Sequence, residues 1–142
     1  MTTIVYDHKN GQIAVDSRVC AGGLICTDNY DKTLKNDIGF WFLCGDNCDF
    51  DYITSLSRGD KVERKINATA FVVRGYSVWE VSAGGDICTW KKLEWSDAIG
   101  SGLPYALAAL DFGKTAKEAI EYAATRDSST GGDVRYFNVS DL

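Results

Sequence analysis

Alternating apolar and polar residues predict a β-hairpin at the start of the chain. Residues 3–7 and 12–17 alternate on either side of Asn10-Gly11, a pair that strongly favours a tight turn between two strands. Three further apolar segments with the character of strands follow, at residues 24–27, 29–34 and 38–43. The last of these is apolar throughout, which is typical of a strand that is covered on both faces.

The middle of the chain predicts one short helix and then a second block of strands. The helix covers residues 48–57 and ends before a polar stretch. The strands are separated by turn-forming segments at residues 74–75 and 83–86, and they cover residues 68–73, 77–81 and 87–93. The pattern therefore indicates a protein that is rich in antiparallel strands.

Two helices are predicted near the C-terminus, before a closing strand over residues 134–139. The first covers residues 103–110, with Pro104 in its first turn, where the missing N–H is harmless. The second begins at Thr115, which forms a capping box with Glu118, and runs to about residue 124. Alanines recur in both helices and would let them pack closely against a sheet, although helix propensity alone explains them equally well.

Length and charge place limits on the class of protein. With 142 residues, the chain is expected to form one domain over residues 1–142, large enough to bury a hydrophobic core. The net charge of −5 and the lack of a Lys/Arg run argue against a nucleic-acid partner. No apolar stretch approaches the roughly 20 residues of a membrane span, and the N-terminus lacks the basic and apolar regions of a secretory signal, so a cytoplasmic location is expected.

Cysteine and histidine usage predicts neither disulfides nor a metal site. The five cysteines are odd in number and contain no CxxC pair, so they indicate reduced thiols. His8 is the only histidine, and only Cys44 and Cys48 are closely spaced, which is too few ligands for structural zinc. Residues 83–86 lack the lysine and hydroxyl of a phosphate-binding loop, and no cofactor is expected.

Thr2 is the first candidate for catalytic chemistry. Removal of Met1 would give Thr2 a free α-amine within reach of its own hydroxyl. Because an α-amine titrates at about 7.7 to 8.0, it is partly unprotonated near neutral pH and can accept the hydroxyl proton during attack on an amide. A Met-Thr start also occurs without any catalytic meaning, so the context has to decide.

Six motifs in a fixed order supply that context. They are Thr2-Thr3-Ile4-Val5, Val15-Asp16-Ser17-Arg18, Lys32, Cys44-Gly45, Gly100-Ser101-Gly102 and residues 126–132. In this order, and over nearly its whole length, the chain resembles proteasome β-type subunits. The resemblance is closest to HslV-like and other short proteasome-type proteases, bacterial or phage, of the N-terminal nucleophile (Ntn) hydrolase superfamily. Six spaced motifs in order are much more specific than any one of them.

The resemblance implies an α+β fold of four layers, an αββα sandwich with two antiparallel sheets face to face and helices outside. The chain departs from the family pattern between Gly45 and the strand at Ala68. This interval has room for one short helix, whereas family members usually carry two longer ones. One helical layer is therefore expected to be reduced, which puts the usual two-ring barrel in doubt.

The resemblance also assigns roles to three residues around Thr2. Lys32, held by Asp16, would keep a positive charge beside Thr2 and so lower the pKa of its hydroxyl and amine. The backbone N–H of Gly45 would face the developing oxyanion, where such a donor is typically worth roughly 3 to 4 kcal/mol of barrier. A structural ion pair between strands and an ordinary glycine at a strand end are the alternatives.

A second set of residues would orient the nucleophile and its water. By resemblance this set is Ser101, Asp127 and Thr130, with Thr130 at a position where the family usually has serine. The alternative for Ser101 is a role near the start of a helix. The pocket beside Thr2 would be lined by a largely apolar set that favours apolar or aromatic side chains: Val19, Tyr30, Leu34, Leu43 and Asn47. A slip of one residue in a strand would exchange inward for outward residues in this set.

The predicted function is therefore that of a threonine-type peptidase that cleaves polypeptides. The peptidase is expected to form a homo-oligomeric ring and to receive its substrates from a separate ATP-dependent unfoldase. Two alternatives stay open. One is a catalytically inactive Ntn-fold module for interaction or assembly, and the other is a hydrolase of small amides.

Overall fold

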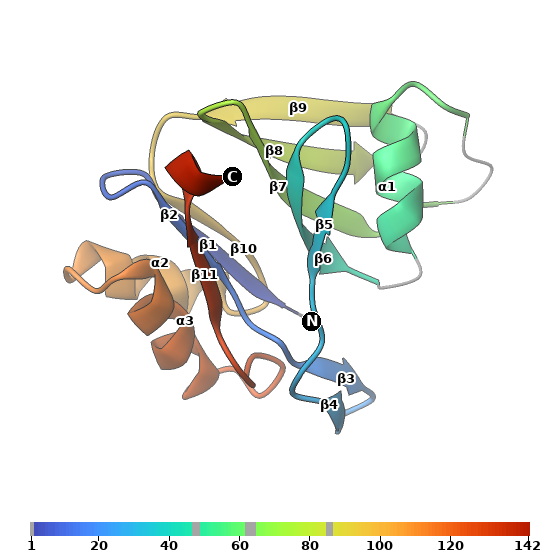
Figure 1. Ribbon diagram of the computed structural model, residues 1–142. Helices are drawn as coiled ribbons and strands as arrows, with labels where there is room; N and C mark the ends of the chain where they lie inside the picture. Colours follow the sequence, from blue (N-terminus) through green and yellow to red (C-terminus); the bar gives the residue numbers. More distant parts are fainter. Residues whose placement is uncertain (1, 47–48, 62–64, 85–86) are drawn as a thin grey trace.

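Two antiparallel sheets and a separate hairpin make up the strands of the computed structural model, which describes residues 2–46, 49–61, 65–84 and 87–142 (Figure 1). The four-stranded sheet has the order β10–β1–β2–β11, from Asp97–Gly100, Thr3–Asp7, Gln12–Val15 and Arg135–Asn138. The five-stranded sheet has the order β5–β6–β7–β8–β9, from Thr33–Lys35, Phe40–Gly45, Ala68–Arg74, Ser77–Gly84 and Ile87–Leu93. The hairpin consists of β3 (Val19–Ala21) and β4 (Leu24–Thr27).

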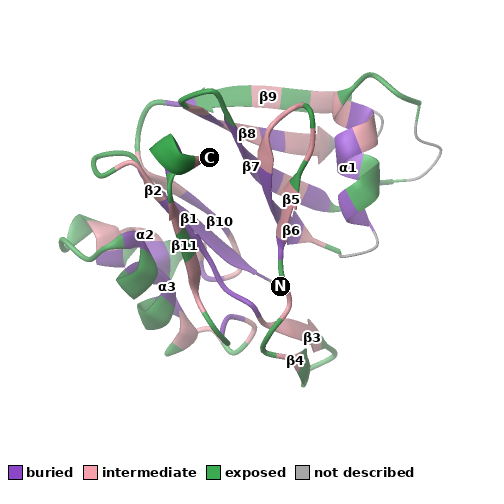
Figure 2. Cartoon of the chain, viewed as in Figure 1, coloured by how far each residue is buried: buried purple, intermediate pink, exposed green. Residues whose placement is uncertain are grey.

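Helices lie on the outer faces of the two sheets. They are α1 (Phe50–Ser57), α2 (Leu103–Asp111) and α3 (Ala116–Ala124), and a short 3-10 helix covers Val139–Asp141. One apolar cluster lies between the sheets, with Ile4 and Ile13 meeting Phe42 and Phe71. A second cluster lies between the five-stranded sheet and α1, and a third between the four-stranded sheet and the other two helices. Buried residues accordingly run along both sheets and the inner sides of the helices (Figure 2).

These layers confirm the predicted α+β sandwich and its reduced helical layer. Within the described residues, the eight residues of α1 are the only helix packed against the outer face of the five-stranded sheet. The outer face of the four-stranded sheet carries α2 and α3, and buried alanines such as Ala106 and Ala119 form much of the contact between them and this sheet. Small side chains therefore allow the close packing that the sequence predicted for this pair of helices.

Several local predictions are confirmed. β1 and β2 pair as an antiparallel hairpin in which Asp7 lies opposite Gln12. The capping box of α3 is present, because the Glu118 N–H donates to the Thr115 hydroxyl at 3.2 Å and the Thr115 N–H donates to the Glu118 carboxylate at 3.1 Å. None of the helices in the described residues is long and apolar enough to cross a membrane.

The strand predicted over residues 29–34 is wrong for most of its length, because β5 begins only at Thr33. The Asp31 carboxylate accepts hydrogen bonds from the Thr33 N–H at 2.9 Å and from the Thr33 hydroxyl at 2.6 Å. Such a local bond competes with the ladder of a sheet and favours a turn. Residues 29–32 therefore approach the sheet as an irregular segment, with Lys32 at its end.

The sequence missed two short strands and placed the start of one helix too early. β3 and β10 were not predicted, because segments of three and four residues carry too little periodicity to be recognised. The helix predicted from residue 48 is described from Phe50 onward, and Cys48 lies outside the described residues.

Candidate active site

Thr2 comes immediately before the first residue of β1. It lies in the wall of a cleft of about 500 Å³ that Lys32, Gly45 and Val19 also line. The residue is 3% exposed. Its carbonyl accepts a hydrogen bond of 2.9 Å from the Ser101 N–H, and Gly100 lies directly beside that carbonyl. Gly100 has φ +100°, and a Cβ at this position would collide with the Thr2 carbonyl. Glycine is therefore required there, and the turn from β10 to α2 holds the backbone of Thr2 in place.

The Thr2 hydroxyl has no hydrogen-bond partner among the described residues. Among these residues, no buried polar side-chain atom lacks a partner. Because every buried polar side-chain atom in this set has a partner and the Thr2 hydroxyl has none, the hydroxyl oxygen is not buried. Thr2 itself lines the cleft. Within the described part of the chain, a nucleophile in this position would therefore have no hydrogen-bond partner to displace before it reacts.

Asp16 and Lys32 form a fully buried ion pair, of which Lys32 lines the same cleft. The Lys32 Nζ lies 2.7 Å from the Asp16 Oδ1, and the two side chains are 1% and 0% exposed. The carboxylate also accepts the N–H of Thr3 at 3.1 Å and the N–H of Gly131 at 3.0 Å. Burial lowers the pKa of the Lys32 ammonium below its ordinary value, and the attraction of Asp16 offsets this only in part.

Ser101, Asp127 and Thr130 also come together, as the sequence predicted. The Asp127 Oδ2 accepts hydrogen bonds from the Ser101 hydroxyl at 2.6 Å and the Thr130 hydroxyl at 2.7 Å. Burial raises the pKa of Asp127, but these bonds and the Ser129 N–H outweigh it and leave the pKa below its usual range. Thr3 was not predicted as a site residue, yet its hydroxyl lies 2.6 Å from the Thr130 hydroxyl and links this cluster to β1.

Gly45 ends β6 at the edge of the cleft with φ +119°, a conformation that favours glycine. The Leu43 N–H donates to the Lys32 carbonyl, and the Asp46 N–H donates to the Asn67 carbonyl on the other side of β6. Because successive N–H groups of a strand point to opposite edges, the Gly45 N–H points to the same side as that of Leu43, toward Lys32. The Asp46 carboxylate accepts a bond of 3.2 Å from the Asn67 side chain, and Asp46 lines the cleft together with Thr2.

The five predicted pocket residues separate in the structure. Val19 lines the cleft beside Thr2. Tyr30, Leu34 and Leu43 instead pack in or against the apolar cluster beneath α1, and Asn47 lies outside the described residues. The alternation of β6 explains the placement of Leu43, because its neighbours Phe42 and Cys44 face the core between the sheets.

Arg18 lines the cleft, although no role was predicted for it. Its guanidinium binds the Asp28 carboxylate through two nitrogens, at 2.7 and 3.1 Å, and donates to the Ser128 carbonyl at 3.0 Å. The contact therefore joins the segment after β4 to the loop that carries Asp127 and Thr130. Its presence in the second motif was the only signal available in the sequence.

Comparison with known proteins bears on both sequence and fold. No protein-family model matches the chain. Among curated proteins, it is 24% identical to proteasome subunit beta type-8 of the dog (Canis lupus familiaris) over 99% of its own length, which covers 65% of that protein. It is 28% identical to proteasome subunit beta type-5 of the chicken (Gallus gallus), over 97% of its own length and 70% of the relative. The chain thus spans about two thirds of the length of these relatives.

Solved structures with the same architecture cover nearly the whole chain. The structure of Thiobacillus denitrificans BPH in complex with epoxomicin matches 96% of this chain and 97% of its own, with a TM-score of 0.71 and 19% identity. The eukaryotic HslV from Trypanosoma brucei matches 96% of this chain and 99% of its own, with a TM-score of 0.72 and 20% identity. At this identity, the similarity establishes the fold.

Proposed function

We propose that this chain, a homologue of proteasome β subunits with the Ntn-hydrolase fold of HslV, is a threonine-type peptidase in which Thr2 is the nucleophile. One observation carries the proposal above the others. A buried ion pair contributes little to stability compared with apolar residues of similar size, yet Asp16 and Lys32 are both fully buried, and Lys32 lines the same cleft as Thr2. A lysine with a shifted pKa in a cleft that also holds a candidate nucleophile is typical of a functional site.

The first half of the reaction forms an ester on Thr2. The Thr2 Oγ attacks the carbonyl carbon of the peptide, and the Thr2 amine, freed by removal of Met1, accepts the hydroxyl proton. The oxyanion that develops on the carbonyl oxygen accepts a hydrogen bond from the Gly45 N–H. When the C–N bond breaks, the ammonium returns the proton to the leaving amine, so that the ester remains on Thr2.

Water completes the cycle. The amine of Thr2 takes a proton from a water molecule, the hydroxide attacks the ester carbonyl, and the proton returns to Oγ as the acid leaves. In this proposal the Lys32 charge lowers the pKa of the hydroxyl and amine, while Ser101, Asp127 and Thr130 orient the amine and the water. Val19 is placed to contact the substrate chain beside the scissile bond.

Hydrolysis should depend on a free amine on Thr2. In protein produced in bacteria, intact-mass spectrometry is expected to show loss of Met1, and that material should cleave fluorogenic peptides. A control chain with an extra lysine inserted between Met1 and Thr2 keeps the amine of Thr2 in an amide, so it should fold normally and be inactive. Equal hydrolysis by the blocked chain would contradict the role of the amine as base.

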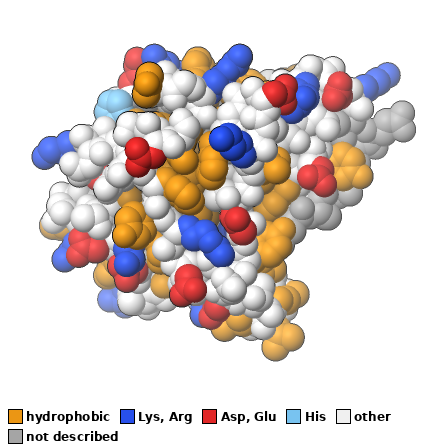
Figure 3. Space-filling view, viewed as in Figure 1, with side chains coloured by type: hydrophobic (Ala, Val, Ile, Leu, Met, Phe, Trp, Pro, Cys, Tyr) orange, Lys and Arg blue, Asp and Glu red, His pale blue; other side chains and the backbone are white. Residues whose placement is uncertain are grey.

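The peptidase is further proposed to work as a ring of identical chains that receives polypeptides from a separate unfoldase. The names of its relatives describe subunits, which supports assembly. The β3–β4 hairpin also exposes apolar side chains next to the cleft, with Leu24 70% and Ile25 49% exposed (Figure 3). Exposed apolar surface of this kind often marks a protein contact.

Native mass spectrometry is the direct measurement of this assembly. A species of several copies is expected, and replacement of Leu24 and Ile25 by serine should shift it toward smaller species. A monomer that cleaves peptides as fast as the assembled protein would contradict the proposed ring but not the proposed peptidase activity.

A further inference from the structure

Lys32 enters the cleft on a segment that has little support from the sheets. Residues 29–32 precede β5 and form no ladder of their own. Two backbone bonds hold this segment, from the Tyr30 N–H to the Ser17 carbonyl at 3.0 Å and from the Leu43 N–H to the Lys32 carbonyl at 2.9 Å. The carbonyl of Tyr30 takes part in neither of these bonds and needs a donor of its own.

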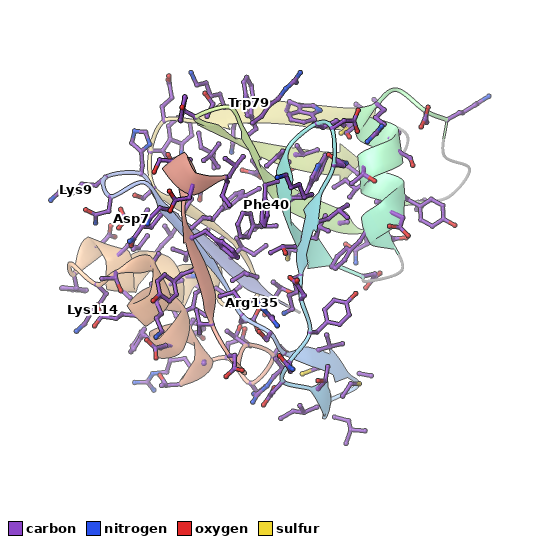
Figure 4. The ribbon with its side chains drawn as sticks, in the orientation of Figure 1. Asp7, Lys9, Phe40, Trp79, Lys114 and Arg135 are labelled. Carbon is purple, nitrogen blue, oxygen red and sulfur yellow. The ribbon has the colours of Figure 1, made fainter. Side chains whose placement is uncertain are left out.

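Arg135 of β11 supplies that donor. Its Nη1 donates to the Tyr30 carbonyl at 2.9 Å and to the Ser17 hydroxyl at 2.7 Å, and its Nη2 donates to the Asn29 side-chain oxygen at 3.1 Å. Figure 4 shows the side chain pointing from β11 toward the segment that leads into β5. Within the described part of the chain, Arg135 makes no ion pair with a carboxylate, so these neutral acceptors are the partners of its guanidinium.

The partners of Arg135 flank both members of the buried ion pair. Ser17 directly follows Asp16, and Tyr30 comes two residues before Lys32. The backbone of Arg135 is itself fixed, because it lies opposite Val15 in the four-stranded sheet. A planar guanidinium presents its donors in a rigid fork, so one side chain anchored in a sheet can set the spacing of two other segments.

We propose that Arg135 is a positioning residue that holds the Lys32 ammonium against Asp16 by binding the residues beside each of them. The structural role of Arg135 follows from its hydrogen bonds alone, whereas its effect on catalysis rests on the proposed function. Loss of the guanidinium frees residues 29–31, so that Lys32 spends more time away from Asp16 and in contact with solvent.

The first test measures the accessibility of Lys32 and needs no enzymatic activity. Native protein is treated with an amine-acetylating reagent, and the rate at Lys32 is followed by peptide mass spectrometry in wild type, Arg135→Met and Arg135→Lys. Lys32 should react about tenfold faster in Arg135→Met, through local opening, and at an intermediate rate in Arg135→Lys. The matched control is Arg74→Met, an exposed arginine at the end of β7, which should leave the rate unchanged.

Hydrogen exchange of β7 distinguishes local release from general loosening. Protection of this central strand should be the same in Arg135→Met and wild type while the Lys32 rate rises. An unchanged Lys32 rate would overturn the proposal, and so would a rise that is matched by faster exchange throughout β7.

The second test measures peptide hydrolysis. Arg135→Met should lower kcat by about 10- to 100-fold with little change in KM, because a misplaced charge affects the reacting atoms more than the binding of substrate. A wild-type kcat in this variant would overturn the catalytic part. If the wild-type protein itself showed no hydrolysis dependent on Thr2, the proposed function would fail, while the acetylation result would still decide the role of Arg135.

Discussion

Thr2→Ala is expected to abolish peptide hydrolysis, with kcat/KM falling by about 10⁴-fold or more, as is typical when a covalent nucleophile is removed. The substitution takes away the attacking oxygen and leaves the rest of the cleft intact. The backbone anchor through the Ser101 N–H does not involve the side chain, so the free energy of unfolding should change by no more than about 1 kcal/mol.

The measurement is the hydrolysis of fluorogenic peptides, together with thermal unfolding of each variant. Thr2→Ser is the matched control, because it keeps a hydroxyl beside an α-amine and should retain measurable activity. Both variants still carry a small residue after Met1, so removal of Met1 should proceed as in wild type. Hydrolysis by Thr2→Ala at the wild-type rate would show that another group is the nucleophile.

Lys32→Met is expected to be both inactive and strongly destabilised. The variant keeps the length of the side chain but removes the charge that faces the Asp16 carboxylate at 2.7 Å. Asp16 is 0% exposed, and a buried charge left without its partner typically costs about 3–5 kcal/mol. Chemical denaturation should therefore show a loss of this size in the free energy of unfolding, and peptide hydrolysis should fall below detection.

The double variant Asp16→Asn with Lys32→Met separates the two effects. An asparagine oxygen can still accept the N–H of Thr3 or of Gly131, and no unpaired charge remains. Most of the lost stability should return while activity stays absent. If Lys32→Met alone were as stable as wild type, the pair would not be the tightly coupled unit that its burial indicates.

Much of the architecture is predictable because it depends on local patterns. The turn at Asn10-Gly11 and the capping box at Thr115 and Glu118 each specify an element through neighbouring residues, and both are confirmed. The order of the motifs predicted which distant residues would meet, and Asp16 and Lys32 do form an ion pair.

Features that depend on contacts between distant parts of the chain could not be predicted from local sequence patterns. Residues 29–32 have the composition of a strand, yet the Asp31 side chain turns the backbone and Arg135 binds it from more than 100 residues away. The pocket prediction depended on the register of several strands, and only Val19 among its described members lines the cleft. A pattern along the chain cannot supply a contact between an irregular segment and a remote strand.

The anchoring of Thr2 has a consequence for how such a site would be switched on. Its backbone is held through the carbonyl, by Ser101 and the space that Gly100 leaves free, and this attachment does not involve whatever precedes the residue. In the proposed peptidase, these two contacts do not depend on the residue before Thr2. The same anchor therefore remains available to hold Thr2 once its amine is free.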